Sequence, residues 1–411
     1  MKLLPASSAE RISTIDILRG LAVFGIFFVN ILYMSTTSVY FERSGVVPAG
    51  ESAVNQGVKL VIELFLSGKC YPILAFLFGV GFFILLSRAE QKGMRIYSFF
   101  LKRMLILYLI GAAHMLFFYG GDILRTYGLL GCLLLLFYRR KERTVLRWAI
   151  SILIVFLLMF SLSFLQPAAD LKESQSKNYT AAQQDSAAAI VAYQSGNYRE
   201  WLAFHLNEDV LPALAMEPIT YPSTFGMMLL GFYGGRIRLF QRIAEFIPLL
   251  RKIRIISGLI SLLVTALLAM ARLKAIDFGV YETTAAQYLI YGFGIFLSLY
   301  YMSTILLALQ KPFVKKLLHP FQYAGRMTLT NYLLQSVISI VVFAGFGLYL
   351  KLNLVMVVGY CFVVILAEIG FSRWWMSRFP FGPMEWVWRR LTYGKLEQAA
   401  KASISGLKIG H

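Results

Sequence analysis

The chain has 411 residues, of which 58% are hydrophobic and only 15% are charged. Soluble domains average about 45–50% apolar and about 25% charged residues. The formal net charge is nevertheless +19, from 40 Lys and Arg against 21 Asp and Glu. This much apolar surface excludes a disordered chain and argues against a soluble enzyme or a nucleic-acid-binding protein. It favours a polytopic membrane protein whose charge is sorted to one side.

Ten apolar runs occur along the chain, each close to the roughly 20 residues that cross a bilayer as a helix. We expect spans at residues 15–35, 69–88, 99–119, 122–138, 146–166, 222–240, 253–272, 285–309, 328–350 and 353–376. The first run is too long for the apolar part of a signal peptide, and no small-residue cleavage site follows it. We therefore expect it to remain as the first span.

The basic residues sort to one side when these ten spans are threaded alternately through a membrane. With the N-terminus in the cytoplasm, 30 of the 40 Lys and Arg are cytoplasmic, and 13 of the 21 acids lie on the other side. A missing or extra span would invert every later loop and destroy this asymmetry. The positive-inside rule therefore predicts an all-α bundle of ten spans with both termini in the cytoplasm.

The polar segments divide the chain into parts. Two five-span halves, residues 1–166 and 222–395, flank a long polar segment at 167–221, and a polar cytoplasmic tail follows at 396–411. The segment 167–221 carries three basic residues against seven Asp and Glu. Its residues 181–214 have the apolar spacing of a partly helical, amphipathic stretch. We expect 167–221 to form an extracytoplasmic cap over the bundle.

Polar residues at the expected membrane depth form an outer and an inner layer. Ionisable groups are costly inside a bilayer, which makes each one a candidate for function. In the outer layer, His114 lies inside the third span, close to its outer end, and Asp122 opens the fourth span just beyond a short turn at Gly120-Gly121. A carboxylate beside a His orients the ring and stabilises the imidazolium ion, as general acid–base catalysis requires. The alternative is a structural His that bonds a helix carbonyl.

Three further outer residues, Asn30, Lys69 and Arg125, lie at similar depth. Lys69 and Arg125 have a simpler explanation, because long basic side chains extend from helix ends to the membrane surface. The inner layer lies at the cytoplasmic ends of the spans and consists of Asp16, Arg19, Arg103, Arg326, Asn331, Gln335, Glu385 and Arg389. Most basic residues in the loops are explained by the positive-inside rule, because they set the orientation of the protein in the membrane. An acid such as Asp16 contributes nothing to that orientation.

Several familiar catalytic and cofactor motifs are absent from the sequence. There is no Gly-x-Gly-x-x-Gly following a strand, no phosphate loop ending in Gly-Lys-Ser/Thr and no Gly-x-Ser-x-Gly elbow. No His-Glu-x-x-His occurs, and the chain has only four His. We therefore expect no metal site.

Motifs spread over nearly the whole chain resemble the YeiB-like bacterial membrane proteins, the family of domain of unknown function 418. They are IDILRGLA at 15–22, GK at 68–69, FLFGVG at 76–81, GAAH at 111–114, GGDIL at 120–124, GRMTLTNYLLQS at 325–336 and FGPMEWVWRRLTY at 381–393. The last two are specific, whereas no recognised motif covers 167–221. The resemblance implies a multi-pass protein of the bacterial cytoplasmic membrane.

The first span also resembles those of acyltransferase-3 proteins and of heparan-α-glucosaminide N-acetyltransferase. Those polytopic enzymes move an acyl group from cytosolic acyl-CoA to an acceptor across the membrane with the help of a His. Acyltransferase-3 proteins usually end the first span with His, and this chain has Asn30 in that place. If the resemblance extends to activity, the role of that His passes to His114.

Our leading hypothesis is therefore a transmembrane acyltransferase that uses acyl-CoA as co-substrate. Arg19, Arg103 and Arg326 would bind the CoA phosphates, since guanidinium groups match phosphate oxygens. His114, oriented by Asp122, would deprotonate the acceptor or carry the acyl group itself. Oxyanion stabilisation would come from Asn30 or Lys69. The other expected substrate-binding residues are Asp16, Arg125, Asn331, Gln335, Glu385 and Arg389.

Two other functions fit the same pattern. Paired polar layers also suit a transporter, lipid flippase or channel, and arginines that bind anionic lipid suit a non-catalytic scaffold. In each case the expected partners are membrane lipids and a small-molecule, glycan or lipid substrate, without nucleic acid. The sequence leaves open the acceptor, the acyl length and whether the protein forms a homo-oligomer.

Overall fold

The computed structural model describes residues 12–44, 51–91, 93 and 96–393, and contains helices and loops but no strand in these ranges. The expected polar tail at 396–411 lies outside the described residues. The first half contains α1 (Ser13–Ser35), α2 (Ser38–Arg43), α3 (Ala53–Phe65), α4 (Cys70–Gln91), α5 (Ile96–Phe117), α6 (Leu124–Leu134) and α7 (Glu142–Leu162). The middle segment contains α8 (Ala168–Gln194), α9 (Tyr198–Phe204) and α10 (Leu211–Met216). The remainder contains α11 (Tyr221–Arg236), α12 (Ile243–Arg272), α13 (Glu282–Gln287), α14 (Gly294–Ala308), α15 (Pro312–Arg326), α16 (Thr328–Ile340), α17 (Leu354–Met376) and α18 (Pro383–Tyr393).

Eight helical stretches among the described residues are long and apolar enough to cross a membrane. They are Ser13–Ser35, Ala53–Gln91, Ile96–Phe117, Glu142–Leu165, Ile243–Arg272, Gly279–Ala308, Thr328–Gly345 and Leu354–Met376. Apolar side chains also cover the outward faces of α7, α12 and α17, where Leu158 is 60%, Leu262 is 69% and Val363 is 67% exposed. A continuous exposed apolar surface of this kind is stable against lipid rather than water. The protein is therefore a multi-pass membrane protein.

The other two expected spans, 122–138 and 222–240, form shorter helices. The first becomes α6 with a following 3₁₀ turn, which together cover Leu124–Phe137, and the second becomes the 16-residue α11. Both are shorter than the roughly 20 residues that a bilayer core requires. However, α6 packs against α5, and α11 packs between α4 and α7. Neighbouring helices therefore cover α11 on all sides, whereas α6 has protein on one side and keeps Leu133 and Leu136 near its end exposed.

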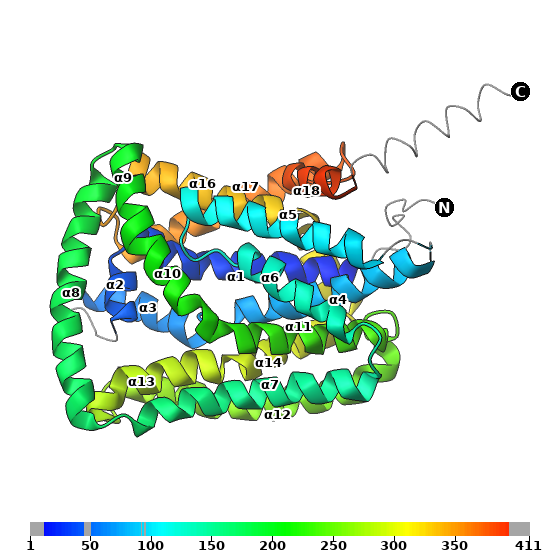
Figure 1. Ribbon diagram of the computed structural model, residues 1–411, viewed down its shortest axis with the longest axis horizontal. Helices are drawn as coiled ribbons and strands as arrows, with labels where there is room; N and C mark the ends of the chain where they lie inside the picture. The colour runs from blue at the N-terminus through cyan, green and yellow to red at the C-terminus, as the bar shows by residue number, and fades with distance from the viewer. Residues whose placement is uncertain (1–11, 45–50, 92, 94–95, 394–411) are drawn as a thin grey trace, which may run out of the picture.

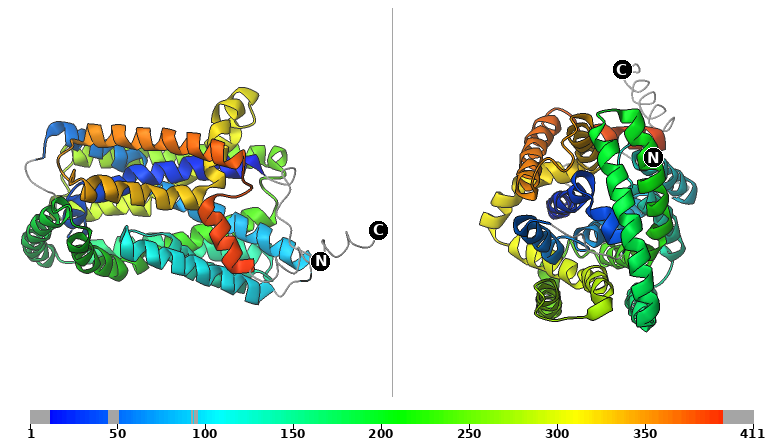
Figure 2. Two further views of the ribbon diagram at one scale, coloured as in Figure 1. Left: turned by 90° about the horizontal axis from the view of Figure 1, so that it is seen from above. Right: turned by 90° about the vertical axis from the view of Figure 1, so that its left-hand side faces the viewer.

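The bundle has two chemically different ends (Figure 1). At the basic end, shown on the right, α4 ends and α5 begins, near Arg88, Arg139 and Arg140. At the opposite cap end, α8 crosses the ends of the bundle helices, which is clearest in the end-on view of Figure 2. The cap is more helical than we expected, since α8 starts at Ala168 and runs for 27 residues before a break at Gly196.

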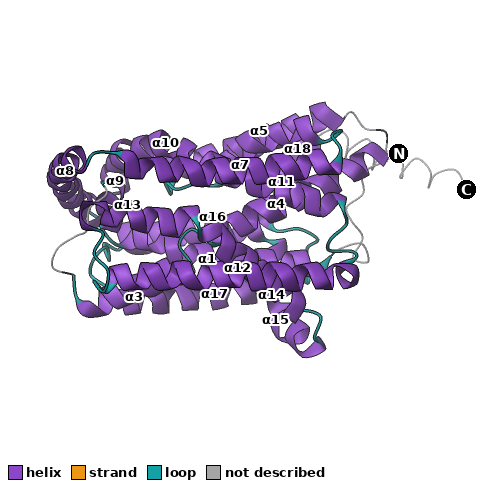
Figure 3. Ribbon diagram, turned by 90° about the horizontal axis from the view of Figure 1, so that it is seen from below, coloured by secondary structure: helices purple, strands orange, loops and turns teal. Residues whose placement is uncertain are grey.

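The central helix α1 packs against α4, α15, α16 and α17. It crosses α15 so closely that a Cβ atom on Gly325 would overlap the carbonyl oxygen of Asp16. The first part of α15 stands clear of the bundle (Figure 3), and Phe313 there is 75% exposed. Close contact through small residues is typical of membrane helix pairs. In this protein the close crossing of α1 and α15 places Arg326, at the end of α15, beside the start of α1.

Substituting Gly325 with alanine should lower the free energy of unfolding by about 1–3 kcal/mol, because the new methyl group forces α1 and α15 apart. Thermal unfolding of the detergent-solubilised protein measures the effect. Gly359 in α17 is the matched control, because a Cβ there meets no heavy atom within 4 Å. Equal melting temperatures for Gly325→Ala and Gly359→Ala would contradict the close crossing.

Candidate functional site

Two large cavities lie inside the bundle, one toward each end. The basic-end cavity has a volume of about 900 Å³, and the cap-end cavity has a volume of about 620 Å³. Both volumes fall in the range of small-molecule and cofactor sites. Tyr127 of α6 lines both cavities, while Leu124 lines the first and Ile123 the second. The start of α6 therefore separates the two cavities.

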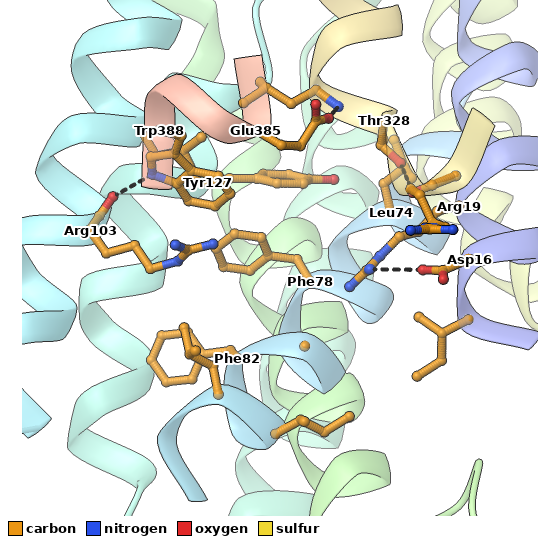
Figure 4. A pocket seen from close by; sticks show the side chains of 18 of the residues that line it. Asp16, Arg19, Leu74, Phe78, Phe82, Arg103, Tyr127, Thr328, Glu385 and Trp388 are labelled. Atoms are coloured by element: carbon orange, nitrogen blue, oxygen red, sulfur yellow. Dashed lines mark hydrogen bonds and ion pairs between the residues drawn. The ribbon is translucent and has the colours of Figure 1, made fainter. Parts of the chain in front are cut away.

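The basic-end cavity is rich in arginine. The charged side chains that line it are Arg19, Arg88, Arg103, Arg326, Arg389, Asp16 and Glu385. Figure 4 shows Arg19 and Arg103 reaching in from opposite sides, with the rings of Phe78 and Tyr127 between them. Asp16 forms an ion pair with Arg19, at 3.5 Å between carboxylate oxygen and guanidinium nitrogen. The excess of guanidinium groups suits a polyanionic ligand.

Aromatic rings hold two of these arginines in the wall of the cavity. The guanidinium carbon of Arg103 lies 3.6 Å from the ring centroid of Trp388, and that of Arg389 lies 4.2 Å from the Phe381 ring. The indole N–H of Trp388 donates to the Arg103 carbonyl oxygen at 3.0 Å. Neither guanidinium group forms an ion pair with a carboxylate of the described chain. Stacking fixes their position and leaves their N–H groups for a ligand.

Glu385 joins α18 to the start of α16. Its carboxylate accepts hydrogen bonds from the backbone N–H groups of Leu329 and Thr330, at 2.8 and 3.1 Å, and from the Thr330 hydroxyl at 2.6 Å. These N–H groups lie in the first turn of a helix, where a carboxylate is favourable. Burial raises the pKa of Glu385, and the hydrogen bonds from Thr330 and Leu329 lower it in part. Glu385 therefore fixes α18 against α16 in the wall of the basic-end cavity.

His114 and Asp122 are neighbours, as the short turn between them predicts. The Nδ1 atom of His114 lies 2.7 Å from Oδ2 of Asp122, and both side chains are buried. The other carboxylate oxygen accepts the backbone N–H of Arg125 at 2.7 Å, which fixes Asp122 at the start of α6. Nε2 of His114 has no hydrogen-bond partner in the described structure. With Nδ1–H donating to Asp122, Nε2 presents a lone pair and can act as a general base.

The His114–Asp122 pair lies behind the walls of the two cavities. Asp122 lines the cap-end cavity. The ring of Tyr332, which lines the basic-end cavity, lies 5.1 Å from the His114 ring between centroids. His114 itself lines neither cavity, and its imidazole lies between Asp122 of the cap-end wall and Tyr332 of the basic-end wall.

A second buried His–Asp pair, which the sequence analysis did not identify, lies in the cap. Nδ1 of His205 lies 2.9 Å from Oδ2 of Asp209, and Nε2 lies 2.9 Å from the carbonyl oxygen of Met115. The Tyr40 and Tyr193 hydroxyls donate to Asp209. Both ring nitrogens of His205 are occupied, so this pair ties the cap to α5 next to His114. The only sequence signal was the four-residue spacing of His205 and Asp209 within an amphipathic segment.

The remaining outer residues have different surroundings. Asn30 lines the cap-end cavity, and its amide oxygen accepts the Tyr119 hydroxyl at 3.2 Å. Lys69 lines neither cavity, and its Nζ donates to the Glu63 carbonyl oxygen at 2.5 Å. The Arg125 side chain forms an ion pair with Glu217 of the cap. Only Asn30 of these three therefore faces a cavity.

Asn331 and Gln335 face α17 and line neither cavity. Nδ2 of Asn331 lies 3.1 Å from the Ser372 hydroxyl, and Nε2 of Gln335 lies 2.8 Å from a Glu368 carboxylate oxygen. Hydrogen bonds of this kind join transmembrane helices. We expected Asn331 and Gln335 to bind substrate, but neither of the two cavities contacts them. In the part of the chain that the structure describes, no three His, Cys, Asp or Glu side chains are grouped to hold a metal.

This chain is similar to one protein family and to bacterial proteins over nearly their full length. The family described as "Protein of unknown function (DUF418)" matches residues 234–395. Uncharacterized protein YxaH of Bacillus subtilis is 30% identical over 97% of this chain and 98% of its own length. Uncharacterized protein YeiB of Escherichia coli is 27% identical over 93% of this chain and 96% of its own length. The resemblance inferred from the motifs is thereby confirmed, and the chain belongs to the DUF418 family.

Proposed function

We propose that the protein is a membrane acyltransferase that takes an acyl group from cytosolic acyl-CoA and transfers it to an acceptor bound at the cap end. The main support is the His114–Asp122 pair, since Asp122 lines the cap-end cavity and the His114 ring contacts Tyr332 in the wall of the basic-end cavity. One cavity suits a polyanion, and the imidazole Nε2 between them has no partner in the described structure. A general base between two binding cavities is the arrangement that acyl transfer across a membrane needs.

The proposed topology has ten crossings, with α6 and α11 added to the eight long apolar stretches. The positive-inside rule then places the basic end in the cytoplasm, together with both termini. The cap faces the extracytoplasmic side. The bacterial relatives support the cytoplasmic membrane as the location.

In this proposal acyl-CoA binds in the basic-end cavity. Arg19, Arg103 and Arg326 bind the phosphates, and Arg389 lies in the wall of the same cavity. The pantetheine arm extends along the apolar wall, which includes Phe78 and the rest of the α4 surface (Figure 4). The thioester thereby reaches the partition at α6.

The acceptor binds in the cap-end cavity, whose lining is mostly apolar and carries acidic but no Lys or Arg side chains. Glu42 lines it and accepts the hydroxyls of Tyr33 and Tyr291 at 2.8 and 2.7 Å. Asn30 contributes an amide group. Such a lining suits an uncharged or cationic acceptor with a hydroxyl or amine group, whether a small molecule, a glycan or a lipid head group. His114 Nε2 takes the proton of that group as it attacks the thioester carbon.

Inside-out membrane vesicles from bacteria that produce the protein provide the test, because they retain the native acceptor. Acetyl-CoA labelled in the acetyl group is added to the exposed cytoplasmic face. We expect free CoA outside and the label in an acceptor, both above vesicles that lack the protein. Equal CoA release in both preparations would refute the proposed activity.

Transport of a solute is the second candidate, because the two cavities share the Tyr127 wall and lie toward opposite ends. A transporter moves its substrate unchanged and needs no thioester. The same vesicles distinguish the two functions, since a transporter produces no free CoA from acetyl-CoA.

A further inference from the structure

We propose that Tyr332 is a catalytic residue whose hydroxyl donates a hydrogen bond to the thioester carbonyl oxygen of acyl-CoA as negative charge develops on it. This role rests on the proposed acyltransferase function and identifies the oxyanion donor of the same site. The sequence suggested Asn30 or Lys69 for that task, and the structure favours a different residue.

Tyr332 occupies the wall between acyl-CoA and the general base. It lies in α16, is only 2% exposed and lines the basic-end cavity. Its ring contacts the His114 ring, at 5.1 Å between centroids. Tyr332 is therefore the cavity-lining residue against which the His114 ring packs.

The Tyr332 hydroxyl has a donor but lacks an acceptor. Its oxygen accepts the backbone N–H of Ile123 at 3.3 Å. Within the described residues no atom accepts its proton. A buried tyrosine hydroxyl normally finds such a partner. An N–H bond to the oxygen also polarises the O–H bond, which makes the hydroxyl a stronger donor.

The other candidate donors are engaged elsewhere or face the wrong cavity. Lys69 donates to the Glu63 carbonyl oxygen and lines neither cavity. Asn30 lines the cap-end cavity, where the acceptor binds. Tyr127 lines both cavities, but its hydroxyl already donates to the Tyr71 carbonyl oxygen at 3.0 Å. Tyr332 alone of these four combines contact with the basic-end cavity and an unused proton.

The surroundings of α16 hold Tyr332 in place. The preceding residue, Asn331, bonds to Ser372 of α17 and to the carbonyl oxygen of Ala324. Glu385 fixes the first turn of α16 through Leu329 and Thr330. A donor that is already fixed costs no reorganisation when charge appears, which is the source of oxyanion-hole catalysis.

The step is balanced without any further reactant. The acceptor hydroxyl or amine loses a proton to Nε2 of His114, and its oxygen or nitrogen bonds to the thioester carbon. The carbonyl π electrons move to oxygen, where the Tyr332 hydroxyl hydrogen-bonds the resulting anion. The carbonyl then re-forms, the carbon–sulfur bond breaks and the CoA thiolate takes the proton from His114. Tyr332 keeps its own proton throughout.

The test compares Tyr332→Phe with Tyr360→Phe in the vesicle assay with acetyl-CoA. Removal of an oxyanion donor lowers kcat by about 10²–10³-fold. We expect that loss for Tyr332→Phe with the KM for acetyl-CoA nearly unchanged, because the ring remains. Tyr360 is the matched control, since its hydroxyl bonds to Ser339 at 3.1 Å and it lines neither cavity. Tyr360→Phe should keep the kcat of the unmodified protein.

The outcomes separate this inference from the proposed function. If Tyr332→Phe keeps its kcat while His114→Gln is inactive, the role of Tyr332 is refuted and the enzyme remains. If neither change affects turnover, the roles of Tyr332 and of His114 are both refuted, whereas CoA release no greater than in vesicles without the protein refutes the enzyme itself. A rise in KM alone would also refute the oxyanion role.

A second variant covers the case in which Tyr332→Phe does not fold. Fluorotyrosine at position 332 keeps the ring and the hydroxyl, and its hydroxyl is more acidic than that of tyrosine. If Tyr332 donates in the transition state, this variant should lose kcat at a lower alkaline pH than the unmodified protein. An unchanged dependence of kcat on pH would refute the oxyanion role of Tyr332.

Discussion

Replacing His114 with glutamine should slow acyl transfer by about 10²–10⁴-fold, because the amide side chain cannot accept the proton of the acceptor. Glutamine can still donate to Asp122, so the packing of α5 against α6 should persist. The rate of CoA release from acetyl-CoA by membrane vesicles measures the loss. The protein should remain folded, with a melting temperature close to that of the unmodified chain.

His319 provides the control for this substitution. It lies in α15, packs against the Tyr323 ring and lines neither cavity. His319→Gln should therefore retain full turnover. Asp122→Asn should lose most of the activity, since an amide no longer selects the tautomer that exposes the Nε2 lone pair. Full activity in His114→Gln would eliminate the general-base assignment.

The second large effect concerns binding rather than turnover. Arg103→Met should weaken CoA binding by about 10- to 150-fold, because a hydrogen bond to a charged group contributes about 1.5–3 kcal/mol. Methionine keeps an apolar stem against Trp388 but removes the guanidinium group. Calorimetric titration of the purified protein with CoA gives the dissociation constant. The kcat at saturating acetyl-CoA should change little, because in the proposal Arg103 binds the CoA phosphates and not the thioester.

Arg139→Met is the matched control for net charge. Arg139 lies at the same end of the bundle, near the Tyr97 ring, but lines neither cavity. A change there removes one positive charge from the surface, and salt screens such long-range effects. We expect a much smaller loss of CoA affinity. Equal losses in Arg103→Met and Arg139→Met would show that the basic end attracts CoA only through its overall field.

The long spans were predictable because transfer into lipid depends on local composition. A run such as α1 or α17 is apolar enough by itself to cross a membrane. The lengths of α6 and α11 were not predictable, since each depends on the helices beside it. Membrane-depth backbone outside a helix is tolerated only where protein covers it.

The chemistry of the site was partly predictable. His114 and Asp122 are joined by a turn so short that any helical hairpin brings them together. Lys69 and Arg125 could not be placed, because their direction depends on the rotation of each helix and on partners far along the chain. The Glu63 carbonyl oxygen engages Lys69, and Glu217 of the cap engages Arg125.

The sequence by itself therefore determined the membrane class, the family, the segregation of charge and the pairing of His114 with Asp122. Each of these depends on composition or on contacts between near neighbours in the chain. Only the tertiary structure decided that the arginines of α1, α5, α15 and α18 line one cavity, that a second cavity lies beneath the cap and that Tyr332 adjoins His114. Those contacts join residues as much as about 370 positions apart, and they are set by packing of helix faces that hydropathy does not distinguish.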